Sequence, residues 1–240
     1  MKALFFAIVD CAIKLRGVIN LNWDGVKMKI SGAIFDMDGT LVDSMPIWHN
    51  VAENYLRARQ ITPPAGLLEQ FHTLSLEQMA ICFHQQLGIA DTPPEIVAQI
   101  YQMLDHGYRY TVPLKPGVEE FLTKLQQQGA PMAVATATDR PMVELVLKRL
   151  KIWGFFDFVL TCSEVGVGKV KPDIFEQALA LLGTEKQQTP VFEDAYYAIA
   201  TAKMAGFPVI AIADPTAIKD KEKIMALADI YVANYADFVG

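Results

Sequence analysis

The stretch that decides the fold of this 240-residue chain is residues 33–44, AIFDMDGTLVDS. It begins with the apolar end of a predicted strand at 30–35, because a short apolar run bounded by turn residues is typical of buried strands in parallel sheets. Asp36 and Asp38 follow in a turn that Gly39 allows. Ligands of open α/β sheets bind outside the carboxyl ends of strands. We therefore expect both aspartates to approach one centre at this edge of a sheet.

The remainder of the chain alternates short apolar runs with stripes of apolar residues at helical spacing. We predict further strands at 132–135, 156–161, 190–192, 208–213 and 230–232. Apolar stripes between them, such as those at 118–125 and 143–150, predict amphipathic helices. Strands that alternate with helices are typical of βα units. The pattern predicts an α/β fold, a doubly wound parallel sheet with a Rossmann-like core.

Residues 44–112 break this alternation, because they contain helical stripes but no strand pattern. We interpret them as an inserted α-helical cap domain that determines substrate specificity. The catalytic core then consists of residues 28–43 and 113–240. Residues 1–27 are interpreted as an N-terminal appendage that need not be native, because Met28 directly precedes the first regular strand.

Composition limits the class of partner. The chain carries 21 Lys and Arg against 27 Asp and Glu, a formal net charge of −6. Nucleic acids and anionic membranes bind basic surfaces, so we expect neither as a partner. The apolar run at 3–9 is much shorter than the ~20 residues of a membrane span. Three widely separated cysteines show no disulfide pattern. These features predict a cytoplasmic protein, and nothing requires more than a monomer.

Four carboxylates follow two of the predicted strands. Asp36 and Asp38 come after the first, and Glu193 and Asp194 come after the strand at 190–192. The carboxyl ends of parallel strands meet at one edge of a sheet, where four such groups repel one another unless a cation lies between them. Oxygen ligands of this kind favour Mg²⁺. The sequence therefore predicts a magnesium site.

Candidate groups for binding an anion follow other strand ends. Thr136 and Ala137 lie where the strand at 132–135 leads into a helix, and free N–H groups at a helix start suit a phosphate. Lys169 and Lys171 lie in a loop before Pro172, and either could contact the phosphate. A metal, a cation and a hydroxyl around a carboxylate nucleophile indicate phosphoryl transfer.

These motifs resemble the haloacid dehalogenase superfamily, in particular its branch related to β-phosphoglucomutase with an α-helical cap. Residues 33–44 match its first motif, and the resemblance extends from residue 28 to about 235. Thr136 fits the second motif and Lys169 the third, while Glu193 and Asp194 fit the fourth, in the order of the family. The third motif departs from the usual pattern, because Val170 and Lys171 separate Lys169 from Pro172.

The resemblance implies a role for each matching residue. Asp36 would attack the phosphorus and become an aspartyl phosphate, while Asp38 would act as general acid and base. Mg²⁺ would be held by Asp36, by the backbone carbonyl of Asp38, and by Asp194 with help from Glu193. Thr136, Ala137 and Lys169 would hold the phosphoryl oxygens.

The cap sequence bears on the substrate. It contains no lysine, and it has three arginines and six acidic residues. His49 and His72 are our candidates for contact with the substrate. We expect a Mg²⁺-dependent phosphatase of a small phosphomonoester, such as a sugar phosphate. A sugar-phosphate isomerase that uses the same intermediate is the first alternative, and a non-catalytic phospho-acceptor or regulatory protein is the second.

Overall fold

Six parallel strands form the central sheet of the computed structural model, which describes residues 19–23, 26–63, 67 and 76–238. They are β3 (Ala33–Phe35), β4 (Met132–Thr136), β5 (Phe158–Thr161), β6 (Val191–Glu193), β7 (Val209–Ile212) and β8 (Ile230–Val232). Their order is β5-β4-β3-β6-β7-β8. Starting from β3, the chain adds β4 and β5 on one side and then β6, β7 and β8 on the other, so the strand order switches between β3 and β6. This reversal is the switch point of a doubly wound sheet, where ligands bind. The predicted α/β fold is confirmed.

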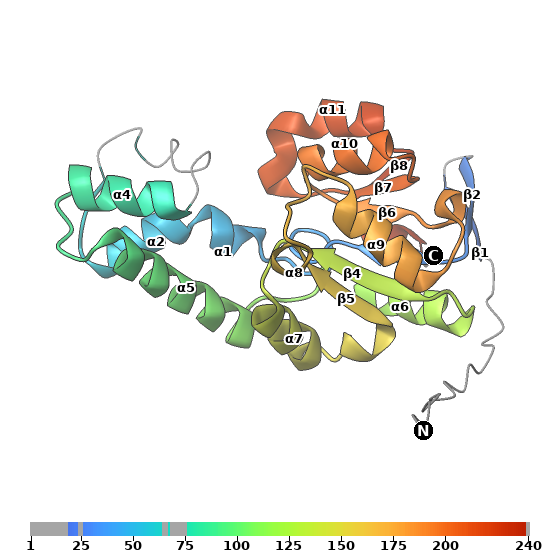
Figure 1. Ribbon diagram of the computed structural model, residues 1–240, viewed down its shortest axis with the longest axis horizontal. Coiled ribbons are helices and arrows are strands. Elements are labelled where there is room, and N and C mark those ends of the chain that lie inside the picture. Colours follow the sequence, from blue (N-terminus) through green and yellow to red (C-terminus); the bar gives the residue numbers. More distant parts are fainter. Residues whose placement is uncertain (1–18, 24–25, 64–66, 68–75, 239–240) are drawn as a thin grey trace, which may run out of the picture.

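Helices cover both faces of this sheet (Figure 1). One face packs against α6 (Val118–Gln127) and α7 (Arg140–Arg149), and the other against α9 (Asp173–Leu182), α10 (Tyr196–Met204) and α11 (Lys221–Leu227). Adjacent residues of β3 illustrate the division, because Ile34 belongs to one apolar core and Phe35 to the other. Phe35 stacks on Phe192 of the neighbouring strand with ring centroids 4.4 Å apart. Burial on both faces explains why the strands are continuous apolar runs.

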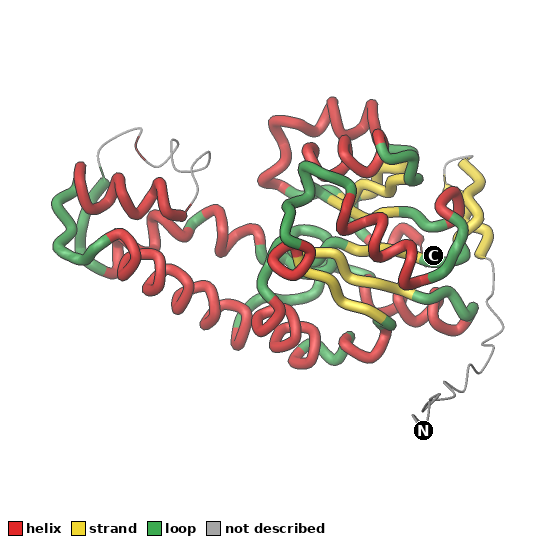
Figure 2. Tube along the Cα trace, viewed as in Figure 1, coloured by secondary structure: helices red, strands yellow, loops and turns green. Residues whose placement is uncertain are grey.

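Between β3 and α6 the chain forms the helices α1 (Met45–His49), α2 (Val51–Ala58), α4 (Leu76–Gln86) and α5 (Pro93–Tyr110). They project from the sheet on the left of Figure 1, and Figure 2 shows helices and loops in the described part of this projection. Tyr55 stacks on Phe83 with centroids 5.2 Å apart, which joins α2 to α4. The helical character predicted for this region agrees with its described residues.

The two connections to this helical insertion run side by side. Val42 forms an antiparallel bridge with Leu114, and the N–H of Asp43 donates to the carbonyl of Pro113 at 2.9 Å. Lys115 is buried and pairs with Asp214 at 2.8 Å, which attaches the return connection to the end of β7. Cap boundaries at 44 and 112 stay a prediction, but the chain enters and leaves the insertion at this paired segment.

The N-terminal side of the sheet differs from expectation. β1 (Ile19–Trp23) and β2 (Val26–Ile30) form an antiparallel hairpin, so Ile30 ends the hairpin and does not begin β3. The predicted strand 30–35 is wrong in its first residues. Ser31 and Gly32 separate the hairpin from β3, and the N–H of Ser31 donates to the carbonyl of Gln188 at 2.8 Å. The appendage at 1–27 stays a prediction, and residues 1–18 lie outside the described part.

Short elements complete the described chain. They are α8 (Cys162–Val165) and the 3₁₀ helices η1 (Trp153–Phe155), η2 (Lys186–Gln188), η3 (Pro215–Asp220) and η4 (Tyr235–Phe238). Among the described helices, none has the length and apolar character that crossing a membrane requires.

Candidate active site

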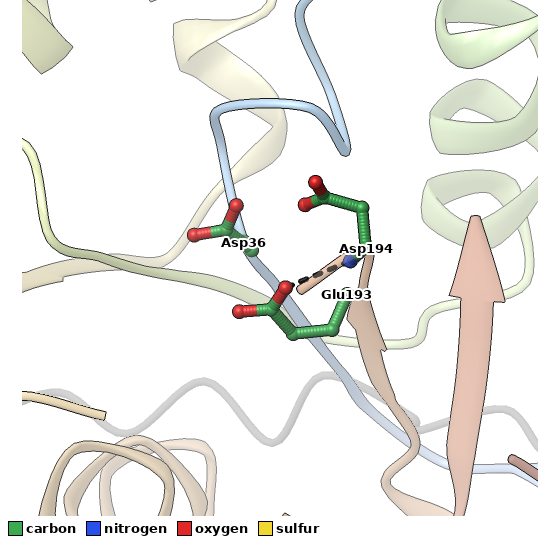
Figure 3. A group of neighbouring side chains, drawn as sticks. All are labelled: Asp36, Glu193 and Asp194. Carbon is green, nitrogen blue, oxygen red and sulfur yellow. Dashed lines mark hydrogen bonds between the residues drawn. The ribbon is translucent and has the colours of Figure 1, made fainter. Parts of the chain in front are cut away.

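Three carboxylates meet at the switch point of the sheet. Asp36 follows β3, Glu193 is the last residue of β6, and Asp194 follows it. Because β3 and β6 pair in register with Phe35 opposite Phe192, the residues after them are neighbours. One carboxylate oxygen from each residue lies within 4.8 Å of the others, and all three side chains are buried (Figure 3). The predicted gathering of these three residues is therefore present in the structure.

Local hydrogen bonds fix the orientation of two of these carboxylates. Glu193 Oε2 accepts from the backbone N–H groups of Asp194 and Ala195 at 2.7 and 2.9 Å. Asp194 Oδ1 accepts from the Thr40 hydroxyl at 3.0 Å. Gly39 has a φ of +78°, and a Cβ at this position would lie 2.3 Å from Asp194 Oδ2. The first motif therefore needs a glycine here both for its backbone conformation and for space.

Lys169 is the cation that contacts this cluster. It is 3% exposed, and its Nζ donates to Asp36 and, at 2.8 Å, to Glu193 Oε1. Lys171 is exposed to solvent two residues further on. The sequence left open whether Lys169 or Lys171 contacts the phosphate. In the structure, Lys169 is the one of the two that contacts the carboxylates.

Burial dominates the electrostatics of the cluster. It raises the pKa of Asp36 to about 8, with Lys169 acting in the opposite direction and Glu193 adding to the increase. Burial also raises the pKa of Asp194 well above its usual range, and Glu193 and Asp36 raise it further. Burial alone would lower the pKa of Lys169, but its carboxylate partners raise it.

Three buried carboxylates therefore share one ammonium group among the described residues, and this arrangement favours a further cation. Their all-oxygen donor set fits a hard divalent ion such as Mg²⁺. Asp36, Glu193 and Asp194 would hold it through their side chains. The Asp38 carboxylate points to other partners, so only its backbone carbonyl is available for the ligand role that the resemblance implied, and this role stays a prediction.

Asp38 is surrounded by hydroxyl groups. Its Oδ1 accepts from Ser44 Oγ at 2.6 Å and from the Tyr108 hydroxyl, and its Oδ2 accepts from Thr138 Oγ1 at 2.6 Å. Tyr108 in turn accepts from Trp48 Nε1 at 2.7 Å. Burial, together with the neighbouring Asp38, raises the pKa of Tyr108 well above its usual value, so its hydroxyl remains a donor. Two donors, Ser44 and Tyr108, come from the helical insertion.

The sequence reasoning missed these three hydroxyl donors. A signal for Tyr108 was present, because the apolar stripe of Ile100 and Leu104 continues to it at i+4. Thr138 lies two residues after Thr136, and its N–H donates to Thr136 Oγ1 at 3.0 Å. Neither pattern alone indicates contact with Asp38.

The predicted site residues that lie outside the helical insertion line one cavity of about 350 Å³. Its lining includes the predicted site residues Asp36, Asp38, Thr136, Ala137, Lys169, Glu193 and Asp194. His49 is not among the lining residues; it is the exposed last residue of α1. His72 lies outside the described residues. Both histidines remain predictions as substrate contacts.

The cavity thus combines a cluster of metal-binding type, a buried lysine and a second aspartate at the switch point of a doubly wound sheet. These features define an α/β enzyme that acts on an anionic group. The model of the haloacid dehalogenase-like hydrolase family matches residues 33–212, and the chain belongs to this family. The resemblance stated from the motifs is confirmed at the level of the superfamily, as is the expectation of a hydrolase.

Several known proteins are similar to this chain. Hexitol phosphatase B of Escherichia coli (strain K12) is 27% identical over 201 residues, which cover 82% of this chain and 90% of that protein. The "probable pseudouridine-5′-phosphatase" of Drosophila melanogaster is 28% identical over 219 residues, covering 89% and 93%. The structure of CbbY from Rhodobacter sphaeroides in complex with phosphate has a TM-score of 0.68 at 22% identity, covering 86% and 95%. This last likeness concerns the fold.

Proposed function

We propose that the protein is a Mg²⁺-dependent phosphatase, which hydrolyses a small phosphomonoester such as a sugar phosphate through an aspartyl phosphate on Asp36. The observation that carries the proposal is the placement of Asp36 and Asp38 on one cavity, the first beside Lys169 and two further carboxylates, the second among hydroxyl groups. The named activities of the two curated relatives support the same reaction class.

The two aspartates divide the chemistry between them. In the first step a carboxylate oxygen of Asp36 forms a bond to phosphorus, the ester P–O bond breaks, and Asp38 gives a proton to the leaving oxygen. In the second step Asp38 takes a proton from water as the water oxygen bonds to phosphorus. The bond between phosphorus and Asp36 then breaks, which releases inorganic phosphate and restores the carboxylate.

Other residues stabilise the charge that develops on the phosphoryl oxygens. Lys169 contacts Asp36 directly, so its ammonium group is within reach of a phosphoryl group on that carboxylate. Thr136 Oγ1 accepts from Thr138 N–H, which leaves its own proton available for a phosphoryl oxygen. A bound Mg²⁺ would neutralise part of the negative charge shared by the carboxylates and the substrate.

The helical insertion offers little support for the isomerase alternative. An isomerase of this kind must hold a second phosphate, which favours cations on the insertion. All three arginines of residues 44–112 have acidic or amide partners: Arg57 pairs with Glu53, Arg59 with Gln99, and Arg109 with Asp105. None of them lines the cavity. A monophosphate substrate therefore fits better than a bisphosphate.

The test is release of inorganic phosphate from a panel of sugar, polyol and nucleoside monophosphates, with Mg²⁺ or with EDTA. Asp36→Asn should abolish release, and Asp38→Asn should nearly abolish it. Asp43→Asn, which changes a carboxylate of the same motif that does not line the cavity, is the matched control and should stay active. Full activity in Asp36→Asn would overturn the mechanism, and isomerisation without phosphate release would favour the alternative. We also expect a monomer, because one chain supplies every residue that the mechanism uses. A cytoplasmic location is expected from the composition of the sequence.

A further inference from the structure

The cavity also has a side with a different chemical character. Met45 and Trp48 of α1, Tyr101 of α5, Met142 of α7 and Tyr197 of α10 form it, and Tyr197 lies close enough to Glu193 and Lys169 for their charges to act on its pKa. These side chains are aromatic rings and thioethers, and Asp139 also lines the cavity. Tyr101 is 38% exposed and Tyr197 is 50% exposed, although large apolar side chains are usually buried. Such residues on a cavity indicate contact with a ligand.

Few hydrogen-bonding groups remain free on this side. Trp48 Nε1 already donates to Tyr108, and Oδ1 of Asp139 accepts from Ser163 Oγ at 2.5 Å, so Oδ2 of Asp139 remains as an acceptor. The hydroxyls of Tyr101 and Tyr197 are the remaining side-chain donors on the described aromatic side. Burial raises the pKa of Tyr197 to about 12 and also raises that of Tyr101, so both phenols are neutral. The two phenols and Asp139 offer the several hydroxyls of a polyol fewer hydrogen-bond partners than water does.

Charge leads to the same conclusion. Lys169 is the one cation among the described lining residues, and its position beside Asp36 assigns it to the reacting phosphate. The residues that face the rest of the substrate carry no positive charge. A second anionic group on the substrate would therefore find no cation to pair with among the described lining residues, and Asp139 would repel it.

We propose that the leaving group of the substrate carries a flat aromatic ring without negative charge, which packs against Tyr101 and the neighbouring apolar side of the cavity. The inference deepens the proposed phosphatase function and rests on it. Aromatic side chains bind the face of a ring through dispersion and offset stacking, and thioethers adapt to its edge. A cavity of about 350 Å³ lies within the usual range of ligand pockets and suits a monophosphate of nucleoside size.

Two substrates isolate the effect of the ring. Ribose 5-phosphate and uridine 5′-monophosphate carry the phosphate on the same primary alcohol, and they differ by the base on the sugar. The reacting oxygens are matched, so a difference in kcat/KM reports contacts of the base. Stacking of one base on an aromatic side chain corresponds to roughly 5- to 150-fold in binding. We expect kcat/KM to be about tenfold or more higher for uridine 5′-monophosphate in the presence of Mg²⁺.

Variants of one residue assign the preference. Tyr101→Leu removes the ring and should reduce the ratio of the two kcat/KM values severalfold, whereas Tyr101→Phe keeps the ring and should retain the ratio. Tyr110→Leu is the matched control, because Tyr110 is on the same helix, 67% exposed, and not on the cavity. The comparison of substrates in the wild-type enzyme does not depend on how any variant folds.

The outcomes separate the two proposals. If both substrates and the other monophosphates of the panel release no phosphate, the phosphatase function fails and this inference fails with it. If ribose 5-phosphate or a polyol phosphate is hydrolysed at least as well as uridine 5′-monophosphate, the phosphatase stands and the ring is refuted. An equal loss of the ratio in Tyr101→Phe and Tyr101→Leu would assign the contact to the hydroxyl and would also overturn the inference.

Discussion

Replacing Lys169 with methionine tests the electrostatics of the carboxylate cluster. The substitution keeps the length of the side chain but removes an ammonium group that contacts Asp36 and lies 2.8 Å from Glu193. These side chains are nearly inaccessible, with exposures of 2%, 8% and 2% for the lysine, the aspartate and the glutamate. Removing one partner of a buried ion pair costs about 3–5 kcal/mol. For a chain of this size, that corresponds to a decrease in Tm of about 6–20 °C.

The loss should depend on pH. Asp36 has a pKa of about 8 in the folded protein, above its ordinary value of 3.8. A raised carboxyl pKa means that the folded state binds the proton more tightly than the unfolded state. This contribution to stability is therefore present at low pH and is lost as the pH rises through about 8. Without Lys169 the carboxylates bind protons more tightly still, so Lys169→Met should destabilise the metal-free protein more at about pH 9 than at about pH 6.

Thermal unfolding followed by circular dichroism in EDTA measures this difference. Lys171→Met is the matched control, because it removes the same charge from an exposed position two residues away. Addition of Mg²⁺ should raise the Tm of Lys169→Met more than that of the wild type, because a divalent cation then supplies the missing positive charge. Equal Tm values for the two lysine variants at about pH 9, or a larger loss at about pH 6, would refute the reasoning.

Two further substitutions test the neighbours of the aspartates. Tyr108→Phe removes a donor to Asp38 and the acceptor of Trp48 Nε1, so the free energy of unfolding should fall by about 2 kcal/mol. A urea titration with an unchanged midpoint would contradict this. Gly39→Ala places a methyl group against Asp194 at a φ of +78°, and Mg²⁺ affinity measured by calorimetry should fall by about tenfold or more. Wild-type affinity in that variant would show that Asp194 can move without consequence.

The fold was predictable because its strands are buried on both faces. Each of the strands β4, β6 and β7 is a short buried run, and α7 after β4 carries a clear apolar stripe. The start of β3 was not predictable in the same way. Ile30 extends the apolar run of β3, but it belongs to the hairpin, and the break at Gly32 is set by contacts with the distant Thr184 and Gln188. A local pattern contains no record of those contacts.

The same distinction applies to the site. Asp36, Thr136 and Glu193 could be placed from the sequence, because the end of a parallel strand fixes where the next side chain lies. Tyr101 and Tyr108 could not, because a helical stripe shows which residues share a face but does not show what that face contacts. Tyr101 follows Ile100 in the sequence of a helical stripe, yet it lines the cavity. The approach of α5 to the sheet depends on the whole fold.

Asp36 and Asp38 show how surroundings give one residue type two roles. They are two positions apart, but Asp36 lies among carboxylates beside an ammonium group, whereas Asp38 accepts from the neutral hydroxyls of Ser44, Tyr108 and Thr138. In the proposed reaction, Asp36 beside the ammonium group is the nucleophile and Asp38 among the hydroxyl groups is the acid–base residue. Since Ser44 and Tyr108 belong to the helical insertion, that segment contributes to the surroundings of the proposed acid–base residue as well as to the proposed leaving-group side of the cavity.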